Sequence, residues 1–244
     1  MILRLFWINF FGLILLAWAA LYASHLPHHI DIFGLHFGGG HSHHNLSTSM
    51  LMWMLMALAM MLPTALPFIR DYASMNKNRQ SSGMLWLLCT GYALVWIGFA
   101  IPASILQHFL FMWQLVDHEG ILNSTLYRGI LLLIIGIYQF TPFKHTCLHK
   151  CRQTTPFLLA HWRTGRYGAF RLGVLHGLYC LGCCWALMLL GFVGGVMNLL
   201  WMGVAMVIMA LEKLPNIGKY LDRPLGIILC GFGVADFVSL ALHL

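Results

Sequence analysis

Seven long apolar stretches constrain this chain more than any other feature, because most of them have the length that a membrane-spanning helix needs. A helix that crosses the hydrocarbon core of a bilayer takes about 20 apolar residues. The 244-residue chain is 60% apolar and 9% charged, which excludes both an ordinary soluble core and a disordered protein. The sequence therefore predicts an all-α, polytopic transmembrane helix bundle forming a single membrane domain, with helices near residues 2–23, 49–69, 84–106, 123–143, 173–195, 198–214 and 224–243.

Two of these segments need comment. The sixth is short and follows the fifth through a tight turn at residues 196–198, so the two form either separate spans or a re-entrant pair. The first begins with Arg4 and a long apolar run, and it lacks a small-x-small cleavage site. We therefore expect a retained helix and not a signal peptide.

The basic residues indicate the orientation of the chain. With the N-terminus inside, the loops that carry Lys and Arg all lie in the cytoplasm, including the basic loop 144–172. The outer loops then contain no Lys or Arg, and Arg128 lies within the fourth helix. The net charge of +7 is thus a sign of topology (N-in, C-out), and it gives no reason to predict nucleic-acid binding.

The fifth predicted helix carries one histidine and three cysteines, His176, Cys180, Cys183 and Cys184. At helical spacing they share a face about 100° wide, so one ion could touch several of them. Thiolates and an imidazole suit Cu(I) or Zn(II). The alternative is that small residues pack helices here, since Gly173 and Gly177 lie on the same side. Packing does not explain an intramembrane histidine, which is a functional candidate by default.

A second set of thiols lies at the inner end of the fourth helix. Cys147 and Cys151 are four residues apart, as are His145 and His149, and on a helical continuation the two pairs lie on different faces. We therefore predict an inner handover site built on the two cysteines. Ordinary polar residues beside anionic lipid are the alternative. In this topology no cysteine reaches the outside, so structural disulfides are not expected.

The first outer loop, residues 24–48, is rich in histidine. Its imidazoles would collect Cu(II), Zn(II) or Ni(II) with low specificity, or the loop is simply solvated and binds no ion. The histidines are His25, His28, His29, His36, His41, His43 and His44.

Methionines form a stripe on the second helix at Met52, Met56 and Met60. Thioethers are weak ligands for Cu(I), but methionine is also an adaptable core residue, so the stripe is only supporting evidence.

Charged residues inside the apolar segments need partners. Arg128 and Asp236 lie at depths that could meet, and we expect them to form an ion pair. Glu212 and Lys213 lie at the inner end of the sixth helix. There, anchoring at the headgroups competes with a role in ligand binding.

Several strings in the second to sixth helices resemble a family described as predicted metal-binding integral membrane proteins, domain of unknown function 2182. The most specific are His176-Gly177, Tyr179-Cys180 and Gly182-Cys183-Cys184-Trp185, with Thr141-Pro142, Cys147-Leu148 and Glu212-Lys213 around them. The resemblance implies a bacterial membrane protein with a metal site, and it supplies no reaction. The His-rich loop is outside the pattern.

These observations predict a soft-metal, copper-type binding protein of the bacterial inner membrane, acting in transport or in delivery to a metalloenzyme or metallochaperone partner. Cu(I) is favoured over Zn(II). The chain lacks a Gly-x-x-x-x-Gly-Lys loop, so we expect a carrier or chaperone and not an ATP-driven pump. The alternatives are a membrane oxidoreductase and a non-catalytic assembly subunit whose Cys and Gly face only packs helices.

Overall fold

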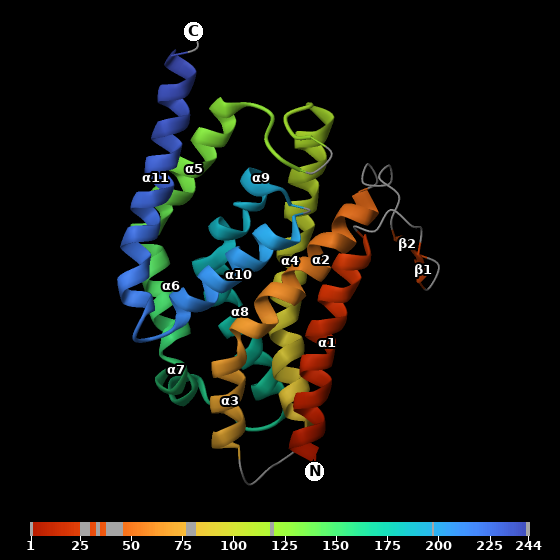
Figure 1. Ribbon diagram of the computed structural model, residues 1–244. Helices are drawn as coiled ribbons and strands as arrows, with labels where there is room; N and C mark the ends of the chain where they lie inside the picture. The colour runs from red at the N-terminus through yellow and green to blue at the C-terminus, as the bar shows by residue number, and fades with distance from the viewer. Residues whose placement is uncertain are drawn as a thin grey trace. The chain divides into compact units, whose positions relative to one another are not determined.

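The computed structural model describes residues 2–24, 30–32, 35–37, 46–76, 82–117, 120–196 and 198–242. Almost all of this part of the chain is helical, which confirms the all-α bundle (Figure 1). The helices are α1 Ile2–Ser24, α2 Leu46–Thr64, α3 Leu66–Met75, α4 Ser82–Met112, α5 Thr125–Gln139, α6 Pro142–Arg152, α7 Thr154–His161, α8 Arg166–Met188, α9 Gly191–Gly194, α10 Leu199–Lys213 and α11 Gly218–Leu242.

A short antiparallel pair of strands lies within the predicted His-rich loop. Strand β1, Ile30–Ile32, pairs with β2, Leu35–Phe37, so that Asp31 is opposite His36. The sequence analysis predicted only a loop in this region.

The chain forms two compact units. The first unit comprises Met1–His108 and Thr154–Leu178, and the second comprises Phe109–Gln153 and Tyr179–Leu244. Helix α8 contributes its N-terminal part to the first unit and its C-terminal part, which carries the three cysteines, to the second.

In the first unit, α1 packs along α2, and α3 packs against α7 (Figure 1). The Tyr92 hydroxyl on α4 donates a hydrogen bond of 3.0 Å to the Met61 carbonyl on α2. Helix α4 also lies very close to α8, because a Cβ at Gly177 would come within 3.0 Å of Val95 Cγ2. The glycines at this end of α8 therefore serve helix packing, as small residues do in membrane proteins.

In the second unit, α5 lies alongside α11 (Figure 1). Glycines allow this close approach, since a Cβ at Gly136 would come within 2.9 Å of the Cys230 backbone nitrogen. Arg128 on α5 donates two hydrogen bonds, of 2.8 and 2.7 Å, to the Asp236 carboxylate on α11. The predicted ion pair between these residues is therefore confirmed.

Five of the described helices are long and apolar enough to span a membrane, namely α1, α2, α4, α8 with its extension to Gly194, and α11. If the bent pair of α5 and α6 is counted as one span, the number of candidate spans among the described residues rises to six. The sequence analysis predicted seven spans. The difference lies in residues 198–214, which form the 15-residue helix α10, below the length of a full span.

Two of the predicted helices are divided in the structure, in each case close to a proline. The predicted helix 123–143 bends by 61° where Pro142 begins α6, after Thr141 in an extended conformation. The predicted helix 49–69 divides at Ala65, next to Pro63. Before α10, Gly195 has a φ of 97° and Asn198 caps the helix, which confirms the predicted tight turn.

Candidate metal centre

Three cysteine thiols on the part of α8 that belongs to the second unit lie close together. The Sγ atoms of Cys180, Cys183 and Cys184 all lie within 4.8 Å of one another, and the three residues are 0% exposed. Cys180 precedes Cys183 and Cys184 by three and four residues, spacings that bring side chains together on a helix, which is why the sequence could predict this group. Within the described ranges, these three cysteines form the group of His, Cys, Asp or Glu residues whose ligand atoms lie close enough together to hold one ion.

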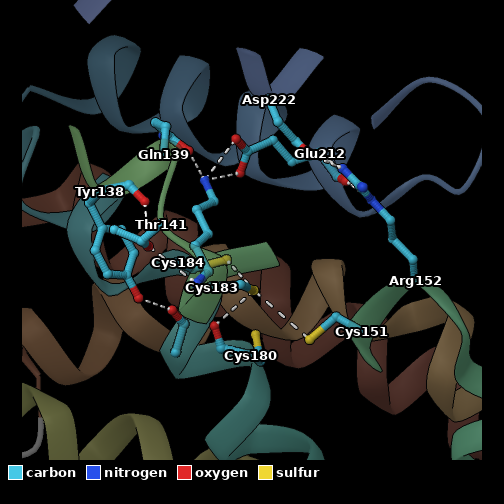
Figure 2. Close-up of polar contacts among 12 residues, drawn as sticks. Tyr138, Gln139, Thr141, Cys151, Arg152, Cys180, Cys183, Cys184, Glu212 and Asp222 are labelled. Carbon is cyan, nitrogen blue, oxygen red and sulfur yellow. Dashed lines mark hydrogen bonds and ion pairs between the residues drawn. The ribbon is translucent and has the colours of Figure 1, made fainter. Parts of the chain in front are cut away.

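A fourth thiol approaches from α6. Cys151 Sγ lies 3.9 Å from Cys183 Sγ, and Figure 2 shows the two side chains pointing toward one another. Cys183 Sγ in turn lies 3.3 Å from Cys184 Sγ. The structure thus places Cys151 beside the α8 thiols, whereas the sequence analysis predicted a separate inner site.

Helix α6 orients its residues as the helical spacing predicted. Cys147 and Cys151 are buried, while His145 and His149 are exposed. Cys147 packs at Gly182, where a Cβ would lie 2.7 Å from Cys147 Sγ. All seven cysteines are free thiols in the structure.

A lysine ammonium also reaches the thiols. Lys213, the last residue of α10, donates from Nζ to Cys180 Sγ at 3.0 Å and is buried. The sequence analysis did not assign Lys213 to the metal site. Glu212 and Lys213 both turn into the protein, so headgroup anchoring does not describe their placement.

A fully buried ion pair connects α6 to α10. Lys144 Nζ lies 2.9 Å from both carboxylate oxygens of Glu212, and these side chains are 1% and 0% exposed. The Gln139 side-chain oxygen at the end of α5 accepts from the same ammonium. Figure 2 shows Gln139 and Glu212 turned toward one another around this point.

Arg152 provides the second link between these helices. Its Nε donates to the Glu212 backbone carbonyl at 2.7 Å, and its Nη2 binds both carboxylate oxygens of Asp222 on α11 at 2.8 Å (Figure 2). Lys144 and Arg152 therefore hold the helix that carries Cys151 against α10 and α11. Sequence reasoning missed both links, although Lys144 and Arg152 bracket the two cysteines in a mainly basic segment.

Tyr138 makes a further contact with the cysteine-bearing part of α8. Its hydroxyl donates to the Gly182 carbonyl (Figure 2), and its ring meets the Trp185 ring edge to face with centroids 5.1 Å apart. Residues at the end of α5 therefore help to fix the helix that carries the thiols.

His176 lies in the first unit among aromatic rings. Its imidazole stacks on Phe68, with ring centroids 3.8 Å apart and an interplanar angle of 6°, and it also contacts Tyr92 and Phe157. His176 is 3% exposed. Its role as a metal ligand stays a prediction.

The remaining predicted ligands lie in the first unit or outside the described residues. Met52, Met56 and Met60 are buried on α2, as core residues would be. In the histidine-rich loop, His36 belongs to β2. The other six histidines lie outside the described residues: His25, His28, His29, His41, His43 and His44.

Comparison with known proteins gives one family. The family model of PpoB2, described as a copper chaperone, matches residues 50–235, well over half of the chain. The matched residues include the four thiols of Cys151, Cys180, Cys183 and Cys184 and the charged residues around them, Lys144, Arg152, Glu212, Lys213 and Asp222. No curated protein and no solved structure matches the chain. The match supports the metal-binding character that the sequence indicated and names copper, while the designation as domain of unknown function 2182 stays a prediction.

Proposed function

Since the chain belongs to the PpoB2 copper chaperone family, we propose that it binds Cu(I) at the α8 thiols within the membrane and delivers the ion to a metalloenzyme or metallochaperone partner. The observation that carries the proposal is the convergence of Cys180, Cys183 and Cys184, with sulfurs within 4.8 Å of one another and no exposed surface. We place the protein in the inner membrane of a bacterium.

The donor set favours the cuprous ion. Thiolates are soft ligands and suit Cu(I), whereas Cu(II) prefers nitrogen and oxygen donors in a tetragonal arrangement. The three clustered donors are all sulfur atoms. Burial also keeps water, a competing oxygen ligand, away from the ion. We therefore assign the bound cargo as Cu(I) and not Cu(II).

Cys151 is the residue best placed for handover. It comes from a different helix than the other three thiols, and its sulfur lies 3.9 Å from Cys183 Sγ. An ion held by the α8 cysteines can therefore pass to Cys151 by exchanging one sulfur ligand for another, without leaving a soft environment. In the proposed topology α6 lies at the cytoplasmic side, so Cys151 leads toward that side.

Copper analysis of purified full-length protein tests the proposal. The protein is loaded with Cu(I) under reducing conditions in detergent, after the loop histidines have been replaced to remove weak outer binding. The wild type is compared with a Cys180→Ser, Cys183→Ser, Cys184→Ser variant. We expect close to stoichiometric copper in the wild type and its loss in the variant, because each serine replaces a soft donor with a hard one.

Two outcomes would contradict the proposal. Wild-type protein that retains no copper would leave the glycine-mediated packing of α8 as the explanation of this sequence pattern and favour an assembly subunit. Copper retained equally by the triple variant would place the ion elsewhere in the chain. An optical spectrum of the same sample tests the oxidoreductase alternative, since haem absorbs strongly in the visible region and Cu(I), with a filled d shell, has no d–d absorption.

A further inference from the structure

A cuprous thiolate site in a protein interior has a charge problem. Each thiolate carries a negative charge and the ion carries a single positive one, so a site with two or more thiolates is negative overall. Burying an uncompensated charge is strongly unfavourable. A site that binds Cu(I) through several buried thiolates therefore needs a nearby positive group.

The second unit places such a group at the thiols. Lys213 Nζ lies 3.0 Å from Cys180 Sγ, and Lys213 is 8% exposed. A lysine ammonium is a compact point charge that can donate to a thiolate without taking the position of a ligand, because it has no lone pair while it is protonated.

The other buried charges in this region are matched with one another. The Glu212 carboxylate binds the Lys144 ammonium, and the Asp222 carboxylate binds the Arg152 guanidinium. These two pairs are each neutral, so they contribute little net charge to the thiols. Lys213 adds one positive charge to this arrangement, directly at the sulfur of a proposed ligand.

The chain also fixes the position of Lys213. It is the last residue of α10, and the backbone carbonyl of the preceding residue, Glu212, accepts a hydrogen bond of 2.7 Å from Arg152 Nε. The same Glu212 side chain is held by Lys144. The end of α10 is therefore attached to α6 at two points, and this attachment presents Lys213 to α8.

We infer that Lys213 is the charge-balancing residue of the copper site, a positioning residue that compensates the negative charge of the cuprous thiolate unit through Cys180. This inference rests on the proposed function and adds a role that neither the cysteine pattern nor the family description contains. It predicts that copper affinity depends on a positive charge at position 213. Whether lysine or arginine carries that charge should matter less.

A competition experiment tests the inference. Full-length protein in detergent competes for Cu(I) with bathocuproine disulfonate under reducing conditions, and the apparent Kd is compared among the wild type and single variants. We expect Lys213→Leu to weaken Cu(I) binding about 10–100-fold, the range found when a group that supports a metal ligand is removed. Lys213→Arg keeps the charge and should bind Cu(I) nearly as tightly as the wild type. Lys219→Leu removes an exposed lysine on α11 and should leave the affinity unchanged.

A double-mutant cycle separates this role from a structural one. If Lys213 acts through the Cys180 thiolate, Lys213→Leu should change the affinity much less in a Cys180→Ser background than in the wild type. An equal loss in both backgrounds, or a loss in Lys213→Arg as large as that in Lys213→Leu, would overturn the inference. An unchanged Cu(I) affinity in Lys213→Leu would overturn the inference about Lys213 and leave the proposed function standing. Wild-type protein that binds no Cu(I) would overturn this inference together with the proposed function.

Discussion

Cys183 links the α8 thiols to Cys151 on α6. Its Sγ lies 3.3 Å from Cys184 Sγ and 3.9 Å from Cys151 Sγ, and it also donates to the Cys180 carbonyl at 3.1 Å. It therefore has neighbours on its own helix and on α6. In the proposed function this sulfur stays bound while the ion moves between the α8 thiols and Cys151.

Replacing Cys183 should accordingly affect copper more than replacing a cysteine outside the cluster. We expect Cys183→Ser to weaken Cu(I) binding by at least about tenfold, because a hard hydroxyl replaces a central soft ligand. Cys89→Ser is the matched control, since Cys89 is also buried but lies in the first unit. Competition with a chromophoric Cu(I) chelator measures both variants. Equal affinities in Cys183→Ser, Cys89→Ser and the wild type would contradict the assignment.

Sequence reasoning could find the α8 thiols because they belong to one helix, where spacing alone determines which side chains share a face. It could not find the Lys213 contact with Cys180, which joins residues 33 positions apart through the packing of α8 and α10. The Arg128 and Asp236 pair could be anticipated although it is also long-range. Each of these residues is the isolated charge of its apolar segment, and a charged side chain inside a membrane usually needs a partner.

At the level of elements, a buried ion pair links α6 to α10. Lys144 and Glu212 are buried almost completely, so removing one charge leaves the other without compensation. We expect Glu212→Gln to lower the free energy of unfolding by about 3–5 kcal/mol, the loss typical of a broken buried pair. Lys144→Leu combined with Glu212→Leu should recover much of that loss, since no charge is then buried alone.

Unfolding of the detergent-solubilised protein in increasing denaturing detergent measures these changes. The copper affinity of Glu212→Gln should also fall, because Cys151 on α6 and Lys213 on α10 both depend on this link. A Glu212→Gln variant with wild-type stability would show that the ion pair does not hold the two helices together.

The contact of α5 with α11 depends on small residues. A Cβ at Gly136 would lie 2.5 Å from Cys230 Sγ and 2.9 Å from the Cys230 backbone nitrogen, so the two helices would have to separate. We expect Gly136→Ala to destabilise the protein by about 1–3 kcal/mol, as overpacking usually does. Gly231→Ala on α11 is the control, because a Cβ there meets nothing within 4 Å.

The same denaturation assay distinguishes the two alanine variants. Gly231→Ala should leave stability unchanged or raise it slightly, since alanine favours helix more than glycine does. A Gly136→Ala variant as stable as Gly231→Ala would contradict the close packing of α5 and α11.

Hydropathy located the helices but not their breaks. The run 123–143 is apolar on average, so hydropathy predicted one helix, whereas Pro142 starts a new helix at 61° to the first. A proline removes a backbone donor and restricts the residue before it, and averaging hydropathy over a window is insensitive to that. The bend matters for the site, because α6 carries Cys151.

For the whole molecule, the class of fold and the metal-binding character could be predicted from the sequence. The number of membrane-spanning helices could not, because it depends on how long each helix is in the structure. Residues 198–214 are apolar enough for a span, but helix α10 has only 15 residues. The end of α10 turns inward because Glu212 binds Lys144 and Lys213 contacts Cys180. These contacts could not be predicted from hydropathy. Orientation in the membrane and a function of the outer histidine loop stay predictions.

The measurement that most directly tests a cuprous thiolate site is X-ray absorption at the copper K-edge. The sample is full-length, Cu(I)-loaded protein in detergent, with the loop histidines replaced so that only the interior site contributes. We predict an edge typical of Cu(I) and a first shell of two or three sulfur atoms, which is lost when Cys180, Cys183 and Cys184 are changed to serine. A first shell of nitrogen or oxygen, or a sulfur shell that survives those three substitutions, would contradict this prediction.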